Sequence, residues 1–433
     1  MNCPLWKKLL LLAATALVTV SSACGVAESS NSVGVIGVWT EGEEAAFNQV
    51  KRRFEEKTGI KVRYQGTRAV EQVLAADVQQ GAAPDIAVLS SPGLLADYAR
   101  RHEIKPLDFL EKKAESFYGR QWVNLQRLGT GKLYSVAVKA DLKSAIWYRP
   151  SSVPGPKPTT WQQLVALAAG PGTPWCLGLA SPPTSGFPGT DWIEDILLHS
   201  AGPEIYRQWA GGTLPWTSDP VRQAFRDWGT LVVRPGGIQG GAPAALLTDF
   251  RDSARPLFTD PPGCRMEHQG SFAMGSYQNM HLRTPTGPHP QPGTDYDFFP
   301  FPGSGASEVS ADLAAMFADT PQARQFLDFL VSPEAQQIWA GNPNASAFSA
   351  GAAVAKDVYP DPVKRKVADT LTAGKPVCFD ASDLMPATMT GAFYRAILEY
   401  TADPTQLDTL LNRLDDTRKG IPREEWLNVP CGQ

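Results

Sequence analysis

Aromatic and polar side chains gather just after the strands that the sequence predicts. Open α/β sheets bind their ligands beyond the carboxyl ends of the strands, so these side chains are candidates for a binding site. Rings can cover the apolar faces of a small solute, while carboxylates, amides and arginine hydrogen-bond its polar groups. The candidates are Trp39, Glu41, Glu43, Thr67, Arg68, Ser90, Ser91, Trp147, Tyr148, Asp191, Trp192, Gln269, Ser271 and Asp383.

Several of these residues also have a purely structural interpretation, which the sequence leaves open. Trp39 could cap the core instead of stacking on a ligand. Glu41 and Glu43 could be acids in the first turn of a helix, where they complement the helix dipole. Arg68 could form a surface salt bridge.

Residues that could cap helices or turns form a second ambiguous group. Ser90 and Ser91 precede a predicted helix and could serve only as its cap. Asp191 could cap its own helix, with Trp192 behind it, and Asp383 could cap a turn. A capping role and a ligand contact therefore both remain open for these positions.

The remaining rings divide by their position in the predicted elements. Trp147 and Tyr148 are adjacent in a strand, so they face opposite sides and at most one lines a cleft. Four other tryptophans recur at helical spacing with apolar residues and are expected in the core: Trp161, Trp209, Trp228 and Trp339.

The motifs of several enzyme classes are missing from the chain. The sequence contains no G-x-S-x-G elbow, no G-x-x-x-x-G-K-[ST] phosphate loop and no H-E-x-x-H zinc motif. Gly129 to Lys132 lead into a strand and fit a hairpin turn. A pair of catalytic carboxylates is set by the fold and leaves no sequence pattern. We therefore expect a protein without enzymatic activity.

Metals, cofactors and nucleic acid are not expected as partners. The five histidines are scattered and no Cys-x-x-Cys spacing occurs, so the sequence predicts neither a metal site nor a cofactor. The 433 residues carry a net charge of −4, whereas a nucleic-acid binder usually has a basic excess. With 43% hydrophobic and 19% charged residues, the chain can fill a substantial core.

The N-terminus has the pattern of an export signal. Lys7 and Lys8 precede an uncharged apolar stretch over residues 9–20, and small residues follow. This order predicts a signal peptide over residues 1–23. The sequence Ser21-Ser22-Ala23-Cys24-Gly25 resembles a bacterial lipobox, although Ser21 stands where Leu is usual. The resemblance implies a lipidated Cys24 and a polar tether over residues 24–32, with a plain secreted protein as the alternative.

Cysteine usage agrees with export. Four cysteines lie beyond the leader region, at positions 176, 264, 378 and 431. An even number in an exported chain predicts two disulfides, and four cysteines allow three pairings. We favour Cys176 with Cys264 and Cys378 with Cys431.

Strands and helices alternate along the first hundred residues. Apolar spacing predicts strands over 33–38, 60–64 and 86–89, separated by helices over 42–57 and 70–80. This alternation implies parallel strands with right-handed crossovers. Further strands are expected over 132–139, 144–148, 175–180, 270–275, 298–302 and 312–317, and the C-terminal third is mostly helical.

A series of short stretches, in this order and spacing, resembles the extracellular solute-binding proteins of carbohydrate ABC importers, and most closely their α-glucoside-binding members. The resemblance covers residues 33–420, and Ala69 stands where an acid usually follows the arginine. The stretches are Tyr64-Gln65-Gly66-Thr67-Arg68, Pro84-Asp85-Ile86, Pro92-Gly93, Pro106-Leu107-Asp108, Gly131 to Tyr134, Ala145 to Tyr148, Pro174-Trp175-Cys176, Thr190 to Asp195, Asp260 to Cys264, His268 to Phe272 and Ser382 to Pro386.

The resemblance implies an α/β, two-lobe, periplasmic-binding-protein-like (maltose-binding-protein-like) fold with a hinge and a ligand cleft between the lobes. Chain crossings are expected near residues 140 and 300. The first lobe would comprise residues 33–140 with 303–350, and the second residues 141–302 with 351–433. Such lobes close on a ligand by hinge motion.

The resemblance also implies a function. The expected protein is a monomeric receptor, lipid-anchored to the outer face of the bacterial cytoplasmic membrane. It would bind a sugar, with an α-glucoside oligosaccharide as the first choice, and deliver it to the transmembrane subunits of an ABC permease. Two alternatives stay open: a non-sugar solute such as a glycerophosphodiester or polyamine, and a secreted glycoside-processing enzyme.

Overall fold

The computed structural model describes residues 31–351 and 353–431. The predicted signal peptide and lipidated Cys24 lie outside the described residues. Among the residues described, none of the helices combines the length and the apolar character required to cross a membrane.

The first of two sheets has the parallel core that the alternating pattern predicts. β1 pairs in parallel with both β2 and β3, whereas β9 runs antiparallel to β3 and β4. The strand order is β10-β9-β3-β1-β2, and β4 pairs with β9. Its strands are β1 (Ser32–Gly37), β2 (Lys61–Gly66), β3 (Ile86–Leu89), β4 (Ser135–Leu142), β9 (Ser307–Met316) and β10 (Val377–Phe379).

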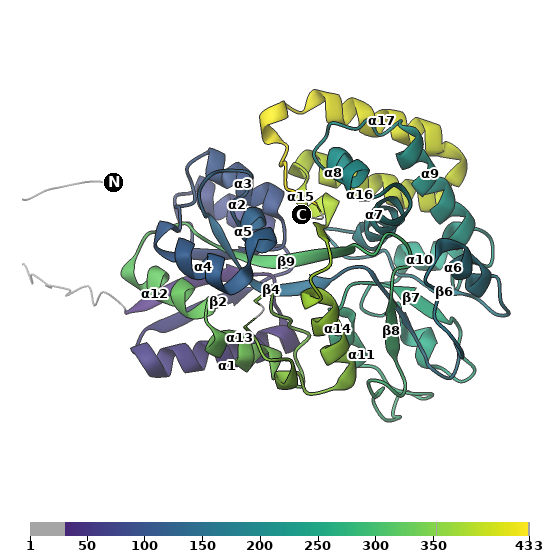
Figure 1. Ribbon diagram of the computed structural model, residues 1–433, viewed down its shortest axis with the longest axis horizontal. Coiled ribbons are helices and arrows are strands. Elements are labelled where there is room, and N and C mark those ends of the chain that lie inside the picture. Colours follow the sequence, from purple (N-terminus) through teal and green to yellow (C-terminus); the bar gives the residue numbers. More distant parts are fainter. Residues whose placement is uncertain (1–30, 352, 432–433) are drawn as a thin grey trace, which may run out of the picture. The chain divides into compact units, whose positions relative to one another are not determined.

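Helices cover both faces of this sheet. Figure 1 shows α2 (Val70–Gln79) and α3 (Pro92–Arg100) on one side, and α1 (Glu41–Thr58) with α13 (Pro333–Ala340) on the other. The α1 helix buries Ala46, Phe47, Val50 and Phe54, the stripe that the helical spacing predicts. It ends at Gly59, whose φ of 71° is the left-handed cap conformation that glycine adopts without strain.

The second sheet, on the right in Figure 1, has four strands in the order β6-β7-β5-β8. Both neighbours of β5 run antiparallel to it. The strands are β5 (Ala145–Tyr148), β6 (Trp175–Cys176), β7 (Met266–His268) and β8 (Asp297–Pro300). The mixed α/β architecture with two sheets agrees with the predicted two-lobe fold.

The other helices surround these two sheets. The α-helices are α4 (Glu111–Tyr118), α5 (Arg120–Gln126), α6 (Trp161–Ala168), α7 (Phe187–Ala201), α8 (Pro203–Ala210), α9 (Asp219–Trp228), α10 (Gly241–Leu247), α11 (Ala273–Tyr277), α12 (Pro321–Leu330), α14 (Pro362–Thr372), α15 (Ala381–Leu384), α16 (Ala387–Ala402) and α17 (Leu407–Gly420). Short 3₁₀ or π turns are η1 (Asp108–Leu110), η2 (Gly229–Val233), η3 (Arg255–Phe258), η4 (Lys356–Val358), η5 (Pro404–Gln406) and η6 (Arg423–Glu425).

One predicted strand is wrong. Residues 270–275 form a turn that leads into α11. The Ala273 N–H donates to the Gly270 carbonyl, and the Met274 N–H donates to the Ser271 carbonyl. The backbone groups therefore bond along the chain, which removes them from any strand ladder.

The chain passes from one sheet to the other between β4 and β5 and returns between β8 and β9. At the crossing, the N–H groups of Lys143 and Ser144 donate to the Glu308 carbonyl, and the Glu308 N–H donates to Ser144 Oγ. β10, which the expected boundaries assign to the second lobe, pairs with β9 of the first sheet. The lobe boundaries themselves stay a prediction.

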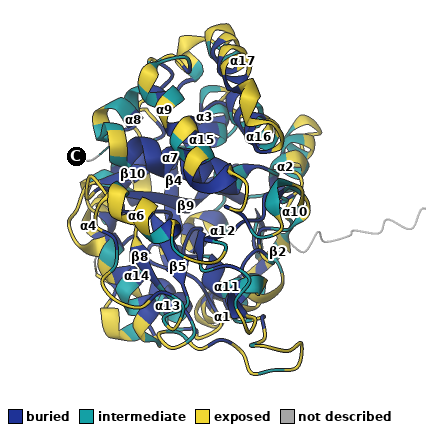
Figure 2. Cartoon of the chain, turned by 90° about the vertical axis from the view of Figure 1, so that its right-hand side faces the viewer, coloured by how far each residue is buried: buried dark blue, intermediate teal, exposed yellow. Residues whose placement is uncertain are grey.

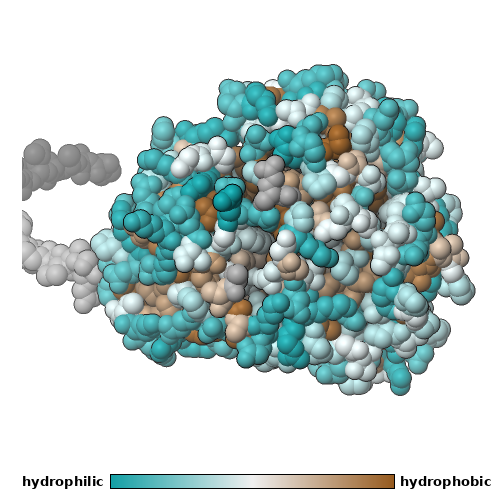
Figure 3. All heavy atoms as spheres, viewed as in Figure 1, coloured by the Kyte–Doolittle hydropathy of each residue, from teal (hydrophilic) through white to brown (hydrophobic). Residues whose placement is uncertain are grey.

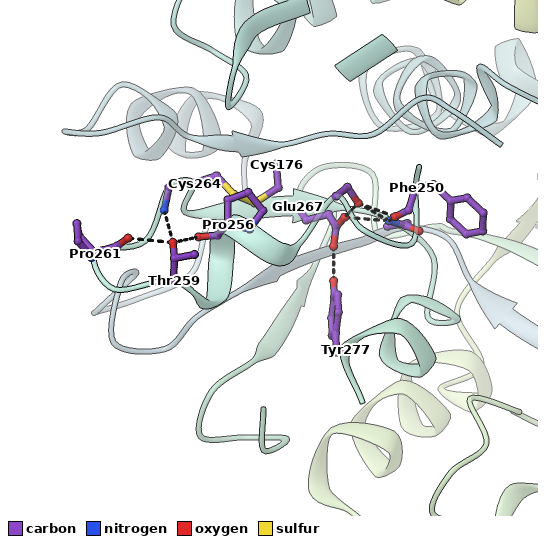
Figure 4. Close-up of a disulfide and its surroundings, with 11 residues drawn as sticks. Cys176, Phe250, Pro256, Thr259, Pro261, Cys264, Glu267 and Tyr277 are labelled. Atoms are coloured by element: carbon purple, nitrogen blue, oxygen red, sulfur yellow. Dashed lines mark hydrogen bonds between the residues drawn. A yellow bond between two sulfur atoms is a disulfide. The ribbon is translucent and has the colours of Figure 1, made fainter. Parts of the chain in front are cut away.

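Two disulfides join the pairs that the sequence favours. Cys176 in β6 bonds to Cys264, just before β7, with 5.4 Å between the Cα atoms (Figure 4). Cys378 in β10 bonds to Cys431 near the C-terminus, with 4.5 Å between the Cα atoms. The second bond ties the last described residue to the first sheet.

Burial follows the layers of the fold. Figure 2 shows buried β4, β9 and α7 surrounded by helices whose outer faces are exposed. On the face drawn in Figure 3, hydrophilic side chains cover most of the surface and apolar ones appear in smaller areas. The apolar residues are thus used mainly to fill the core.

Candidate ligand-binding cleft

A cavity of about 850 Å³ lies among loops and helix ends from both sheets. Its size falls within the usual range for small-molecule sites. From the first sheet it receives residues that follow β1, β2 and β3, the carboxyl ends that the sequence analysis selected. From the second it receives the start of α7 and the loops after α10 and β7.

Half of the predicted site residues line this cavity and half do not. The seven that line it are Glu41, Glu43, Arg68, Ser90, Ser91, Asp191 and Asp383. The seven outside its wall are Trp39, Thr67, Trp147, Tyr148, Trp192, Gln269 and Ser271. Contact with a ligand stays a prediction for the residues of the first group.

Trp39 belongs to the core of the first sheet. Its side chain is 1% exposed, and its Nε1–H donates to Asp312 Oδ2 at 2.7 Å. The ring packs against Phe47 and Trp339, with centroids 4.8 and 4.6 Å away. We assign no stacking role to Trp39, because its faces are covered by neighbouring rings.

The predicted rings of the second sheet are also core residues. Trp147 is fully buried and donates its Nε1–H to the Gln269 carbonyl at 2.7 Å. Trp192 is 1% exposed and packs edge-on against Trp175 at 4.7 Å between centroids. Tyr148 is buried as well. Large aromatic side chains gain most from complete burial, and this preference places all three away from the cavity.

The three polar residues outside the wall hold local structure. Gln269 Nε2 donates to the Phe250 carbonyl at 3.2 Å, and Ser271 Oγ donates to Asp141 at 2.8 Å. Thr67 Oγ1 accepts the Ala69 N–H at 3.2 Å, next to the start of α2. These contacts position residues that do line the cavity, namely Phe250 and Asp141.

The aromatic wall of the cavity is built from phenylalanines that the sequence analysis missed. Phe187, Phe250 and Phe272 line the cavity together, and Tyr394 joins them. The Phe187 and Phe250 centroids are 5.0 Å apart, and Phe272 lies 6.2 Å from each. Two features of the sequence could have identified two of them. Phe187 lies one helical turn before the candidate Asp191, and Phe272 directly follows the candidate Ser271.

Phe250 is held by a buried glutamate (Figure 4). Glu267, on β7, accepts from Tyr277 and Ser253, and it accepts from Gln269 at 2.9 Å. Gln269 in turn donates to the Phe250 carbonyl, and Ser253 Oγ lies 2.6 Å from the same carbonyl oxygen. Burial raises the pKa of Glu267 to about 7 against the opposing effect of these hydrogen bonds.

One buried ammonium lies at the cavity wall on the side of the first sheet. Lys139 Nζ is 3.0 Å from Glu43, 3.3 Å from Asp141 and 3.9 Å from Asp312. Burial alone would lower the pKa of Lys139, but the three carboxylates outweigh it and raise the pKa. Burial raises the pKa of Asp141 to about 6 despite the neighbouring lysine. Ser90 donates to Asp312 at 2.6 Å, so its hydroxyl hydrogen is already used.

A second buried ammonium lies on the other side. Lys143 Nζ bridges Asp191 at 2.8 Å and Asp380 at 2.9 Å, and it lies 5.5 Å from the Phe187 ring centroid and 5.6 Å from that of Phe272. Burial raises the pKa of Asp191 to about 6, with Lys143 acting against it. Asp191 Oδ1 is buried and has no partner among the described residues. Asp191 lines the cavity, so a ligand donor that reached this oxygen would find it without a competing hydrogen bond.

The same carboxylates could in principle hold a cation. Oxygens of Asp191, Glu308 and Asp380 lie within 4.8 Å of one another. Lys143 already places a positive charge against two of them. The lysine thus supplies the counter-charge that a metal ion would otherwise provide.

Arginines flank the aromatic wall. The guanidinium carbon of Arg68 lies 5.5 Å from the Phe250 centroid, and that of Arg251 lies 5.8 Å away. Arg251 is paired with both oxygens of Asp249, at 2.9 and 3.1 Å. Arg68 has no carboxylate within salt-bridge distance in the described part of the chain.

Two features of helix starts occur at the cavity wall, one in α1 and one in α3. Glu41, the first residue of α1, has a φ of 53°. This left-handed conformation costs a residue with a side chain roughly 1–2 kcal/mol. Ser91 occupies the N-cap position of α3, but its side chain makes no capping hydrogen bond. The Ser91 hydroxyl thus remains available at the cavity wall.

Comparison with known proteins shows where this arrangement belongs. Residues 39–337 match the family model of bacterial extracellular solute-binding proteins. The chain is a member of this family. Extracellular solute-binding proteins are exported, in agreement with the predicted leader.

Two relatives of this solute-binding protein match nearly its full length. It is 33% identical over 396 residues to the alpha-glucosides-binding periplasmic protein AglE of Rhizobium meliloti (strain 1021), covering 86% of this chain and 84% of the relative. It is also 33% identical over 414 residues to the osmoprotective compounds-binding protein GgtB of Synechocystis sp. (strain ATCC 27184 / PCC 6803 / Kazusa), covering 89% and 93%.

A solved structure confirms the fold of this solute-binding protein. The structure of a chitin oligosaccharide binding protein superposes with a TM-score of 0.74 at 17% identity, covering 90% of this chain and 98% of the other. At this identity the likeness shows the fold alone. It confirms the two-lobe fold that the sequence predicts.

Proposed function

We propose that this solute-binding protein binds a sugar in the 850 Å³ cavity and delivers it to an ABC permease, with an α-glucoside oligosaccharide as its ligand. The proposal rests on one observation above the others. An apolar wall of Phe187, Phe250 and Phe272 shares the cavity with Asp191 Oδ1 and Ser346 Oγ, buried atoms that lack partners among the described residues.

This arrangement matches the surface of a sugar. The C–H faces of a pyranose are apolar, while its hydroxyls donate and accept hydrogen bonds. A carboxylate oxygen without a partner gains a charge-assisted hydrogen bond when a hydroxyl reaches it. AglE, which is similar over most of the chain, is named for binding α-glucosides. We propose that the lobes close on the ligand by hinge motion at the β4–β5 and β8–β9 crossings.

The charge of the cavity supports a neutral ligand. Lys139 and Lys143 each lie between carboxylates, and Arg251 is paired with Asp249. A phosphodiester would need several converging free cations, and Arg68 is the one cavity cation that we find without a carboxylate among the described residues.

A second candidate ligand class is a neutral osmoprotective solute. GgtB, named for binding osmoprotective compounds, is as similar to this chain as AglE is, at 33% identity. The polar cavity atoms would also serve a small polyol. A polyol lacks the ring face of a sugar, so it would use less of the phenylalanine wall.

Calorimetry with a matched set of sugars tests the proposal. We expect maltose or a longer α-linked glucoside to bind more tightly than cellobiose, which differs only in the linkage. Tighter binding of glycerol-type polyols would support the second class instead, and no binding to any sugar would overturn the proposal. Release of shorter sugars during incubation would show a glycoside-processing enzyme.

We further propose that Cys24 carries the lipid that anchors the mature protein to the outer face of the membrane. One acyl chain anchors weakly, so stable attachment would need a second chain. Fractionation tests this proposal: Cys24→Ala should release the protein into the medium. A variant that stays with the membrane would refute lipidation at Cys24.

A further inference from the structure

Two histidines that are eight positions apart in the sequence lie against each other in the loop between α11 and β8. The ring centroids of His281 and His289 are 4.5 Å apart, with 32° between the ring planes. His281 and His289 are both exposed, so solvent ions can reach the pair. The scattered histidines had given no reason to expect a metal site, because the fold of this loop brings these two together.

The hydrogen bonds of the two rings fix which nitrogen is free. His281 Nδ1 lies 2.6 Å from the Gly287 carbonyl oxygen, and His289 Nδ1 lies 2.8 Å from the Met280 carbonyl oxygen. A carbonyl oxygen only accepts hydrogen bonds, so each Nδ1 carries the hydrogen. Each neutral ring therefore keeps an unshared electron pair on Nε2.

Neither Nε2 atom is used by a hydrogen bond or ion pair within the described part of the chain. Histidines that ligate metals usually donate their other ring N–H to a carbonyl or carboxylate, which fixes the tautomer and the ring orientation. Both histidines already have this second contact.

We propose that His281 and His289 bind a divalent transition-metal ion through Nε2, with Zn²⁺ as the representative ion. Imidazole suits Zn²⁺, Cu²⁺ and Ni²⁺, whereas Ca²⁺ and Mg²⁺ prefer oxygen ligands. Water completes the coordination, because this pair supplies only two protein ligands.

Such a site would act on the loop that lines the ligand cavity. Met280, whose carbonyl accepts from His289, contributes to the cavity wall together with Gln278 and Asn279. A metal that joins His281 to His289 would hold residues 280–289 in one conformation. The site lies outside the set of residues that we assign to the solute, so its test does not depend on the proposed function.

Zinc titration of the full mature chain tests the proposal. By isothermal calorimetry at pH 7.5, Zn²⁺ should bind wild-type protein at one site, and His281→Gln and His289→Gln should each weaken binding at least tenfold. His102→Gln, which removes an exposed histidine elsewhere, serves as the matched control and should bind as wild type does. Ca²⁺ should give no heat at the same concentrations, because it prefers oxygen ligands to imidazole nitrogen.

Hydrogen exchange gives a second measurement, which detects zinc binding without requiring a dissociation constant. Zn²⁺ should slow exchange of the amides in residues 278–291 of the wild type and leave them unchanged in His289→Gln. Circular dichroism checks that the variants are folded. Equal zinc binding by wild type and a His281→Gln/His289→Gln double variant would overturn the proposal, as would the absence of binding to the wild type at millimolar zinc.

Discussion

The guanidinium of Arg68 lies over the ring of Phe250, with 5.5 Å between Cζ and the ring centroid. Arg68 follows β2 of the first sheet, whereas Phe250 follows α10 on the side of the second sheet. This contact spans the cavity that both residues line. A cation over an aromatic face is worth about 0.5–2 kcal/mol, depending on its exposure.

The Arg68–Phe250 contact should contribute to ligand affinity. If it stabilises the closed cleft, Arg68→Ala and Phe250→Ala should each weaken sugar binding about threefold to thirtyfold. The double variant should lose less than the two single effects combined, because both remove the same contact. Calorimetry of the four proteins with the tightest sugar measures this coupling; strictly additive losses would show that the contact plays no part in binding.

Asp191 should be the main acceptor for a ligand hydroxyl. Its Oδ1 faces no protein donor, while its Oδ2 is held by Lys143 at 2.8 Å. Asp191→Asn keeps the shape and removes the charge, so affinity should fall by about 1.5–3 kcal/mol, the usual value of a hydrogen bond to a charged group. Asp416→Asn, exposed on α17, is the control. Unchanged affinity in Asp191→Asn would mean that the carboxylate serves only Lys143.

Glu267 should make stability depend on pH near neutrality. Burial raises its pKa in the folded protein to about 7, above the ordinary value of 4.5. Between these values the folded state binds more protons than the unfolded state, so the free energy of unfolding decreases as the pH rises. The decrease from this group is on the order of 3 kcal/mol at most.

Glu267→Gln removes this titration. Compared with wild type, its free energy of unfolding should decline less between pH 5 and pH 8, as measured by urea unfolding at several pH values. Glu424→Gln, which changes an exposed glutamate, should show the wild-type slope. A variant whose slope equals that of wild type would assign the pH dependence to other buried acids.

Lys139 should be needed for folding stability as well as for the cavity. Lys139→Met leaves Glu43, Asp141 and Asp312 without their shared counter-charge. Removing one partner from a buried charge cluster typically costs about 3–5 kcal/mol. Urea unfolding at pH 7.5 should show this loss, and Lys132→Met at an exposed position should not. A smaller loss is expected at pH 5, because the pKa of Asp141 is raised to about 6 and its carboxyl becomes neutral there.

Much of the fold was predictable because local patterns and global packing agree. The stripe of Phe47, Val50 and Phe54 with the cap at Gly59 predicts α1, and the structure contains that helix. The alternation of strands and helices predicts the parallel pairing of β1 with β2 and β3. Residues 270–275 were predicted wrongly, because a short apolar run does not show whether its backbone bonds to a neighbouring strand or along the chain.

The sequence predicted where in the fold the candidate site lies, but it did not predict which side chains line it. The rule that ligands bind beyond the strand ends found Glu43, Arg68 and Asp191 at the cavity. The same rule selected Trp39 and Trp192, which the structure buries. Position along a strand does not reveal on which side a ring finds its partners.

The sequence alone determined the order of the elements, the cysteines available for pairing and the edge of the sheets at which a ligand could bind. Only the tertiary structure decided which side chains reach the cavity, why Lys139 and Lys143 are each shared between carboxylates, and how His281 meets His289. The physical reason is the separation along the chain of the residues that interact. Helix and strand patterns depend on neighbours in the chain, whereas burial, charge pairing and ring contacts depend on residues brought together from distant segments.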